Sequence, residues 1–190
     1  MSPINSKIYR FADAIHIAET TPKSLRKWLQ NPEVKLPSSG EEDGWREFNF
    51  ADLMVLATMR KLVDFGQDVA GANAFAMVIN MAHSLVLYHE GNASPAKLVR
   101  AFSGVRAFLY QIDRPEDPWQ LQLASKGKLF DPPAASFLTI RMEALARRVF
   151  ERLVEVDPEA AKELGAPAPI LSVDGKPPGR AKRSAKKRGT

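Results

Sequence analysis

The pair Thr21-Pro22 is the feature of the sequence that most constrains the fold. Threonine is a favoured N-cap residue and proline fits the first turn of a helix, so a helix is predicted to begin here and to end at Asn31-Pro32. Apolar residues at three- and four-residue spacing predict an earlier helix over residues 9–19. Two short helices separated by so few residues are typical of a helix-turn-helix.

The residues that follow predict a small β-wing and a third helix. Extended stretches at 34–37 and 44–48 flank a polar turn at 38–43. Asn49 is then predicted to cap a helix, with Asp52 completing a capping box. Apolar residues continue at helical spacing until the helix is predicted to end at Gly66: Leu53, Leu56, Met59 and Leu62.

The remainder of the chain predicts a mostly helical part with a small β element. Residues 67–88 are apolar on nearly all sides, which predicts a buried helix. Further helices are expected at 94–102 and 158–165, because each begins with a proline in a favourable position. Residues 105–112 and 119–123 are candidate strands, and their pattern leaves strand and irregular structure both open.

A strongly amphipathic helix is predicted over residues 141–156. Beyond it, prolines, glycines and a run of cations predict a disordered tail. The sequence therefore predicts a mainly α (α+β) fold in three parts: a winged helix-turn-helix domain at 1–70, a mostly helical dimerisation or regulatory domain at 71–165, and a disordered basic tail at 166–190. The predicted apolar stripe of the 141–156 helix is Met142, Leu145, Ala146, Val149, Phe150 and Leu153.

Charge and composition restrict the functional classes. The net charge is +5, but residues 176–190 carry seven Lys and Arg and no acid, so the excess lies in the tail. The chain has no cysteine and its three histidines form no metal-ligand pattern, so no metal or other cofactor is expected. Without a nucleophile-base pair or a glycine-rich phosphate loop, no enzyme is predicted. Without a signal segment or a bilayer-length apolar stretch, we expect a cytoplasmic protein that has no membrane partner.

Four short motifs follow one another between residues 25 and 66. In order they are Leu25-Arg26 with Trp28, Gly44-Trp45-Arg46-Glu47-Phe48, Asp52-Leu53, and a leucine-led helix end at 62–66. Over about residues 8–70 they resemble the DNA-binding domain of MerR-type transcription regulators. The resemblance implies a winged helix-turn-helix that binds double-stranded DNA, in a protein that acts as a dimer.

The sequence departs from the family pattern at three places. Glu19 stands where the helix-turn-helix commonly has glycine, so we expect a positive φ there at a cost of about 1 kcal/mol. Val63 stands at a position that is usually arginine, and the wing turn carries three acids. Members of the family that sense metals or thiols often use cysteines, so the resemblance does not imply such sensing here.

The second helix and the wing carry the candidate DNA-binding residues. Lys23, Arg26 and Lys27 are predicted to face the major groove, where arginine can donate two hydrogen bonds to guanine; the alternative is a solvated helix face. For Arg46, a phosphate contact competes with a cross-strand pair to Glu41 or Glu42. The full predicted set is Thr21, Lys23, Ser24, Arg26, Lys27, Lys35 and Arg46.

The sequence thus predicts a regulator of transcription that binds double-stranded DNA sequence-specifically, with no effector specified. A homodimer is expected through residues after Gly66, with 67–88 and 141–156 as candidate interfaces; alternatively, these two helices cover each other in one subunit. Two other classes stay open. One is a DNA-architectural or mobile-element factor, such as an excisionase-like protein or a packaging adaptor; the other is a protein-interaction domain with a vestigial helix-turn-helix.

Overall fold

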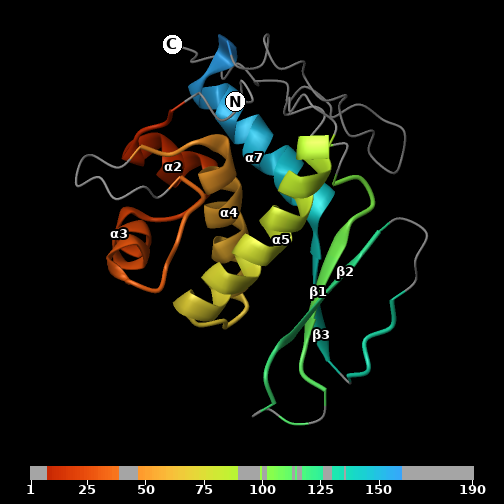
Figure 1. Ribbon diagram of the computed structural model, residues 1–190. Coiled ribbons are helices and arrows are strands. Elements are labelled where there is room, and N and C mark those ends of the chain that lie inside the picture. Colours follow the sequence, from red (N-terminus) through yellow and green to blue (C-terminus); the bar gives the residue numbers. More distant parts are fainter. Residues whose placement is uncertain are drawn as a thin grey trace, which may run out of the picture.

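The structure is a computed structural model that describes residues 8–38, 47–89, 99, 102–112, 114, 117–125, 130–134 and 136–159; of residues 82–89 it describes the backbone. These residues form an α+β architecture of five helices and one three-stranded sheet, the mixed class that the sequence predicts (Figure 1). The elements are α2 (Phe11–Ile17), α3 (Pro22–Gln30), α4 (Phe50–Asp64), α5 (Val69–His89), β1 (Arg106–Tyr110), β2 (Gln120–Ala124), β3 (Phe137–Arg141) and α7 (Met142–Val156).

Helices α3 and α4 begin where their capping residues predict. Thr21 Oγ1 accepts a hydrogen bond from the backbone N–H of Ser24 at 3.0 Å, ahead of a proline in the first turn. At α4, Asn49 and Asp52 form the predicted capping box, in which each side chain accepts from the other residue's backbone N–H, at 3.0 and 2.9 Å. Gly66 follows α4 with a φ of 90°, which glycine adopts without strain.

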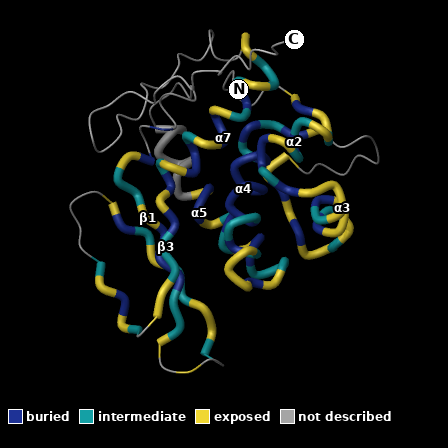
Figure 2. Tube along the Cα trace, turned by 180° about the vertical axis from the view of Figure 1, so that it is seen from behind, coloured by how far each residue is buried: buried dark blue, intermediate teal, exposed yellow. Residues whose placement is uncertain are grey.

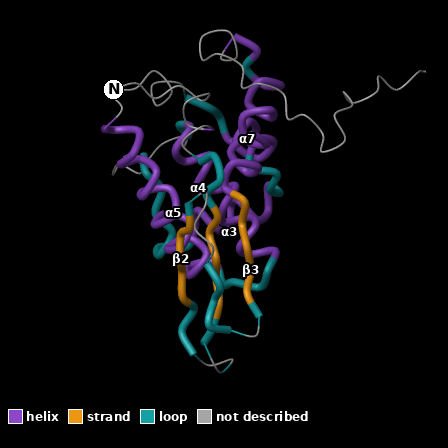
Figure 3. Tube along the Cα trace, turned by 90° about the vertical axis from the view of Figure 1, so that its right-hand side faces the viewer, coloured by secondary structure: helices purple, strands orange, loops and turns teal. Residues whose placement is uncertain are grey.

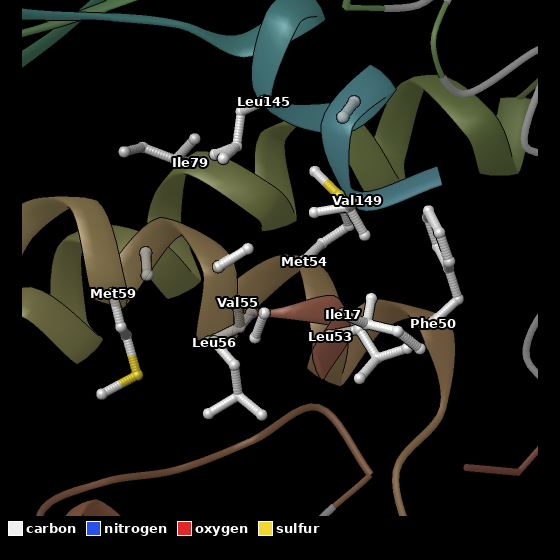
Figure 4. Packing of buried hydrophobic residues seen from close by; sticks show 14 of the residues in the cluster. Ile17, Phe50, Leu53, Met54, Val55, Leu56, Met59, Ile79, Leu145 and Val149 are labelled. Carbon is white, nitrogen blue, oxygen red and sulfur yellow. The ribbon is translucent and has the colours of Figure 1, made fainter. Parts of the chain in front are cut away.

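Helix α4 lies at the centre of the molecule. Its residues 52–59 are all buried, and α2, α5 and α7 pack around it. Figure 4 shows side chains of α4 meeting Ile17 of α2, Ile79 of α5 and Leu145 of α7. Helices α2, α5 and α7 therefore share one core, and α4 lies at its centre.

Helix α5 confirms the predicted helix at 67–88 but not its burial on all sides. Ala74, Val78 and Met81 are exposed, while Ala72 and Ile79 are buried toward α4. The expectation is wrong for the described part of α5 because α4 takes the central position. A lack of charge permits burial on every side, but only the packing of other elements produces it.

Helix α7 is amphipathic as predicted, and its apolar stripe is buried within the chain. All six residues of the predicted stripe are buried, and the helix packs against α2 and α4. The stripe therefore belongs to the core of one subunit. This corrects the expectation that it was a candidate interface for a second copy.

The sheet has the antiparallel order β2-β1-β3, and it confirms both candidate strands. The strand β3 was not predicted; it leads directly into α7, since Arg141 is its last residue and also the N-cap of the helix. Ala107 and Leu109 of β1 belong to the helical core, while Phe108 on the opposite face contacts Phe130, with ring centroids 5.1 Å apart. The sheet and α3 lie on opposite sides of the molecule (Figures 1 and 3).

The first strand of the predicted wing is not a strand. The backbone N–H and carbonyl of Lys35 bond instead to the side-chain amide of Asn73 in α5, at 2.9 and 2.8 Å. Phe48, at the end of the predicted second strand, pairs with Tyr9 ahead of α2, at 2.8 and 2.9 Å. The prediction for 34–37 fails because α5 supplies the two bonds that a partner strand would supply.

Some predictions fall outside the described residues. They are Arg46 with the rest of 44–46, most of the expected helices at 94–102 and 158–165, and the tail at 166–190. Within the described residues, one cluster of buried apolar side chains extends from Tyr9 to Leu153 and so includes residues on both sides of position 70. None of the described helices combines the length and the apolarity that crossing a bilayer requires.

Candidate nucleic-acid interface

Helix α3 has one face in the core and one face in solvent. Leu25 and Trp28 point inward and are 0% and 3% exposed, so the tryptophan is a core residue. Lys23, Arg26 and Lys27 are exposed on the opposite side, and Figure 2 shows this side of α3 at the surface. The separation follows from helical spacing, because residues three or four positions apart share a face.

The three cations of α3 pair with no carboxylate among the described residues. The helix itself contains no Asp or Glu. The guanidinium of Arg26 lies 5.6 Å from the centre of the Phe11 ring, in a cation–π contact with α2. Because this contact uses the face of the ring, it occupies none of the N–H donors of Arg26. The outward face of α3 is therefore positive and has donors to offer to an anion.

Thr21 and Ser24 bond to each other at the start of α3. Besides accepting the N-cap bond, Thr21 Oγ1 donates to the hydroxyl oxygen of Ser24 at 2.9 Å. Thr21 is exposed and Ser24 is half-buried. Both side chains thus fix the N-terminal turn of α3, which is the turn that carries Lys23.

Lys35 follows α3 by a few residues and has an exposed side chain. Its neighbours Val34 and Leu36 are buried, so the alternation of an extended segment turns Lys35 outward. Its backbone is held by Asn73, which is itself 3% exposed and gives both bonds described above. Sequence reasoning had no signal for this contact, since the two residues are separated by 38 positions.

Asp52 holds the end of the same segment against α4. Its fully buried carboxylate accepts from the backbone N–H of Asn49 at 2.9 Å, the backbone N–H of Ser38 at 2.9 Å, and the Ser38 hydroxyl. Three donors compensate the burial of the carboxylate, which leaves this acid inside the fold rather than on the surface near α3.

The turn between α2 and α3 contains Glu19 at a φ of 52°, which confirms the expected positive φ. The N–H of Glu19 bonds to the carbonyl of His16 at 3.3 Å, and the N–H of Thr20 to the carbonyl of Ile15 at 3.1 Å. These two bonds are those of a Schellman motif, in which the position of Glu19 is usually glycine. A residue other than glycine adopts this left-handed backbone conformation at a cost in free energy, because its Cβ crowds the backbone.

The carboxylate of Glu19 is bound by two arginines of α7. Oε1 accepts hydrogen bonds from Nε of Arg148 at 2.8 Å and from Nη2 of Arg152 at 3.1 Å, and Nη2 of Arg148 forms an ion pair with it at 2.8 Å. Burial, the strongest single influence on the pKa of Glu19, acts to raise it, but the hydrogen bonds and charges of the two arginines together hold this pKa below its usual range. The resemblance implied the positive φ of this residue, and its two arginine partners were not predicted.

The outward face of α3 carries exposed cations on a helix whose inward face is buried in the core. In the described part of the chain, no group of three or more His, Cys, Asp or Glu is arranged to hold a metal ion.

No protein-family model and no curated protein matches the chain.

Proposed function

We propose that this chain is a sequence-specific regulator of transcription that binds double-stranded DNA as a homodimer. In this proposal α2 and α3 act as a helix-turn-helix and α3 enters the major groove. The observation that carries it is the outward face of α3, where Lys23, Arg26 and Lys27 have no described carboxylate partner. Cations that an acid does not neutralise attract phosphate and release its counterions.

The dimensions and side chains of α3 support this reading. The major groove is about 12 Å wide and admits one helix. Arg26 can donate two bonds to guanine, and Lys23 and Lys27 can contact the flanking phosphates. Leu25 and Trp28 fix the helix to the core, so these contacts need little ordering on binding. Lys35 adds a further exposed cation, on a backbone that Asn73 holds.

The proposed dimer forms through α5. This 21-residue helix contains no Lys, Arg, Asp or Glu, and Ala74, Val78 and Met81 lie on one exposed apolar stripe. Val78 is 47% exposed and Met81 is 60% exposed. Depletion of charge and enrichment of methionine are typical of interface centres, and an apolar stripe matches the same stripe on a second copy across a two-fold axis.

Selection of bound duplexes from a random library, using the full chain at a defined salt concentration, tests the DNA proposal. We expect one enriched motif in two copies related by a dyad, spaced by about one helical turn of 10 to 10.5 base pairs. Binding and bending without an enriched motif would instead indicate an architectural factor. The absence of salt-dependent binding would leave the protein-interaction class.

Light scattering at micromolar concentration tests the dimer. We expect twice the chain mass for the parent and the mass of one chain for Met81→Lys, which places a charge in the proposed interface. The matched control is Phe65→Lys, because Phe65 is equally exposed, at 61%, but follows α4 rather than lying on the stripe. A monomeric parent, or a dimer that Met81→Lys leaves intact, rejects α5 as the interface.

A further inference from the structure

Glu19 occupies a backbone position that favours glycine. Its side chain nevertheless makes polar contacts that the turn itself does not require. The two backbone bonds of the turn do not involve the carboxylate. The carboxylate instead reaches α7, 129 and 133 residues away in sequence, and binds Arg148 and Arg152. A glycine would relieve the left-handed strain and lose these bonds. What the glutamate adds is therefore a connection between the turn and α7.

A second connection runs parallel to the first. Nε2 of His16, at the end of α2, lies 2.8 Å from a carboxylate oxygen of Glu155 in α7. Arg152 joins the two connections, since its guanidinium bonds Glu19 and also lies 3.5 Å from Glu155. The end of α2 and the turn before α3 are thus both attached to the same stretch of α7.

Helix α7 provides a rigid reference for these contacts. Its apolar stripe is buried in the core with α2 and α4, and its opposite face carries the arginines. Helix α3, by contrast, has nine residues, and one face of it is attached to the core through Leu25 and Trp28. These anchors lie on one side of α3, and the turn that contains Glu19 joins the helix at its N-terminal end, so contacts in the turn act on the direction of α3 in addition to the core.

We propose that Glu19 is a positioning residue, which uses Arg148 and Arg152 of α7 to fix the direction in which α3 presents its cationic face. Through this link α7 affects how α3 binds DNA, although α7 does not contact DNA itself. Through Arg141, where β3 becomes α7, it also connects the turn to the sheet on the far side of the molecule. The consequence for DNA rests on the proposed function, whereas the consequence for the orientation of α3 does not.

The orientation is measured directly by a spin-label distance between α3 and α7 in the absence of DNA. The chain contains no cysteine, so Gln30→Cys and Ala144→Cys, both at exposed positions, give two unique labels. We expect a narrow distance distribution in the parent background and a broader or shifted one when Glu19→Gly is added. The melting temperature should stay close to that of the parent, because relief of strain offsets the lost ion pairs. An unchanged distribution overturns the proposal.

The DNA readout uses the same substitution without labels. Glu19→Gly removes a negative charge, which by electrostatics alone would tighten binding to any sequence. We expect the opposite for the selected site: a loss of about tenfold in specific affinity, with an unchanged salt slope, since no phosphate contact is removed. The matched control is Glu151→Gln, which also removes one negative charge; Glu151 lies 3.8 Å from Arg148 within α7 and does not reach the turn. This control should retain parental affinity or bind slightly more tightly.

The outcomes separate the two proposals. If the parent selects no DNA site, the proposed function fails and the distance measurement alone decides the role of Glu19. If the parent binds its site and Glu19→Gly binds it equally well, Glu19 does not position α3 for reading DNA. Equal losses of affinity in Glu19→Gly and Glu151→Gln also overturn the proposal, because the effect would then follow charge and not the link to the turn.

Discussion

Helices α3 and α7 are both amphipathic and both carry three cations, yet their charged faces differ in kind. On α7, Arg147 pairs with Glu143 at 3.1 Å, and the other two arginines bind Glu19. On α3, Lys23, Arg26 and Lys27 have no carboxylate partner among the described residues. Equal numbers of cations therefore give a neutralised surface in one helix and a positive surface in the other.

The difference indicates where an anionic ligand would bind, which the net charge of the chain does not. The +5 charge is an excess of the tail, and the number of cations does not distinguish α3 from α7. The position of the acids does distinguish them, since a cation that already has a partner gains little from phosphate.

The apolar sides of the two helices should behave alike. Trp28→Ala in α3 and Phe150→Ala in α7 each remove a large buried side chain, 3% and 2% exposed, and should each lower the free energy of unfolding by about 3 to 5 kcal/mol. Urea unfolding followed by circular dichroism measures both. A cost below about 1 kcal/mol for Trp28→Ala would show that α3 does not pack on the core as described.

The charged sides should differ in DNA binding. Arg26→Ala is expected to lower the affinity for the selected site by about 1 to 3 kcal/mol with little change in melting temperature, because Arg26 is exposed and contributes only its cation–π contact with Phe11 to the fold. Arg147→Ala, which removes a paired cation from α7, is expected to leave the affinity unchanged. Fluorescence anisotropy with both variants measures this. Equal effects of the two substitutions would remove the distinction between the helices.

The ion pairs of α7 should make a small, pH-dependent contribution to stability. The pKa of Glu19 is held below its unfolded value of about 4.5, so the stabilisation is fully present above that pH and is lost as the pH falls through the folded pKa. Glu19→Gln should therefore be less stable than the parent at pH 7, by no more than about 1 kcal/mol for pairs in contact with water, and the difference should vanish at lower pH. Paired melting curves between pH 7 and pH 3 measure it, and a difference that persists at the acidic end would contradict the assignment.

Local chemistry explains why the N-terminal helices were predictable. Thr21, Asn49 and Gly66 act within one turn of their own position, so a single sequence contains both the signal and its consequence. The positive φ of Glu19 was implied by the resemblance, and the Schellman turn that imposes it likewise involves only a few residues. For the candidate site, this gave α3, its capping residues and its outward cations.

Contacts between distant segments explain what was missed. Asn73 replaces a partner strand for Lys35, and Arg148 binds Glu19, but neither partner is marked in the sequence as different from its neighbours. The strand β3 shares its last residue with the start of α7, so the helical pattern obscured it. The central role of α4 likewise depends on three helices packing around it, which composition does not determine.

The salt dependence of DNA binding tests whether the cations of α3 contact DNA. The full chain and a variant that combines Lys23→Gln, Arg26→Gln and Lys27→Gln would be titrated with the selected duplex over a series of salt concentrations. If α3 presents its cations to DNA, the slope of log K against log salt should fall in magnitude by about 2, near 0.9 for each of the two phosphates that Lys23 and Lys27 would neutralise. A variant that keeps the parental slope and affinity would show that the cationic face of α3 is not where this protein meets DNA.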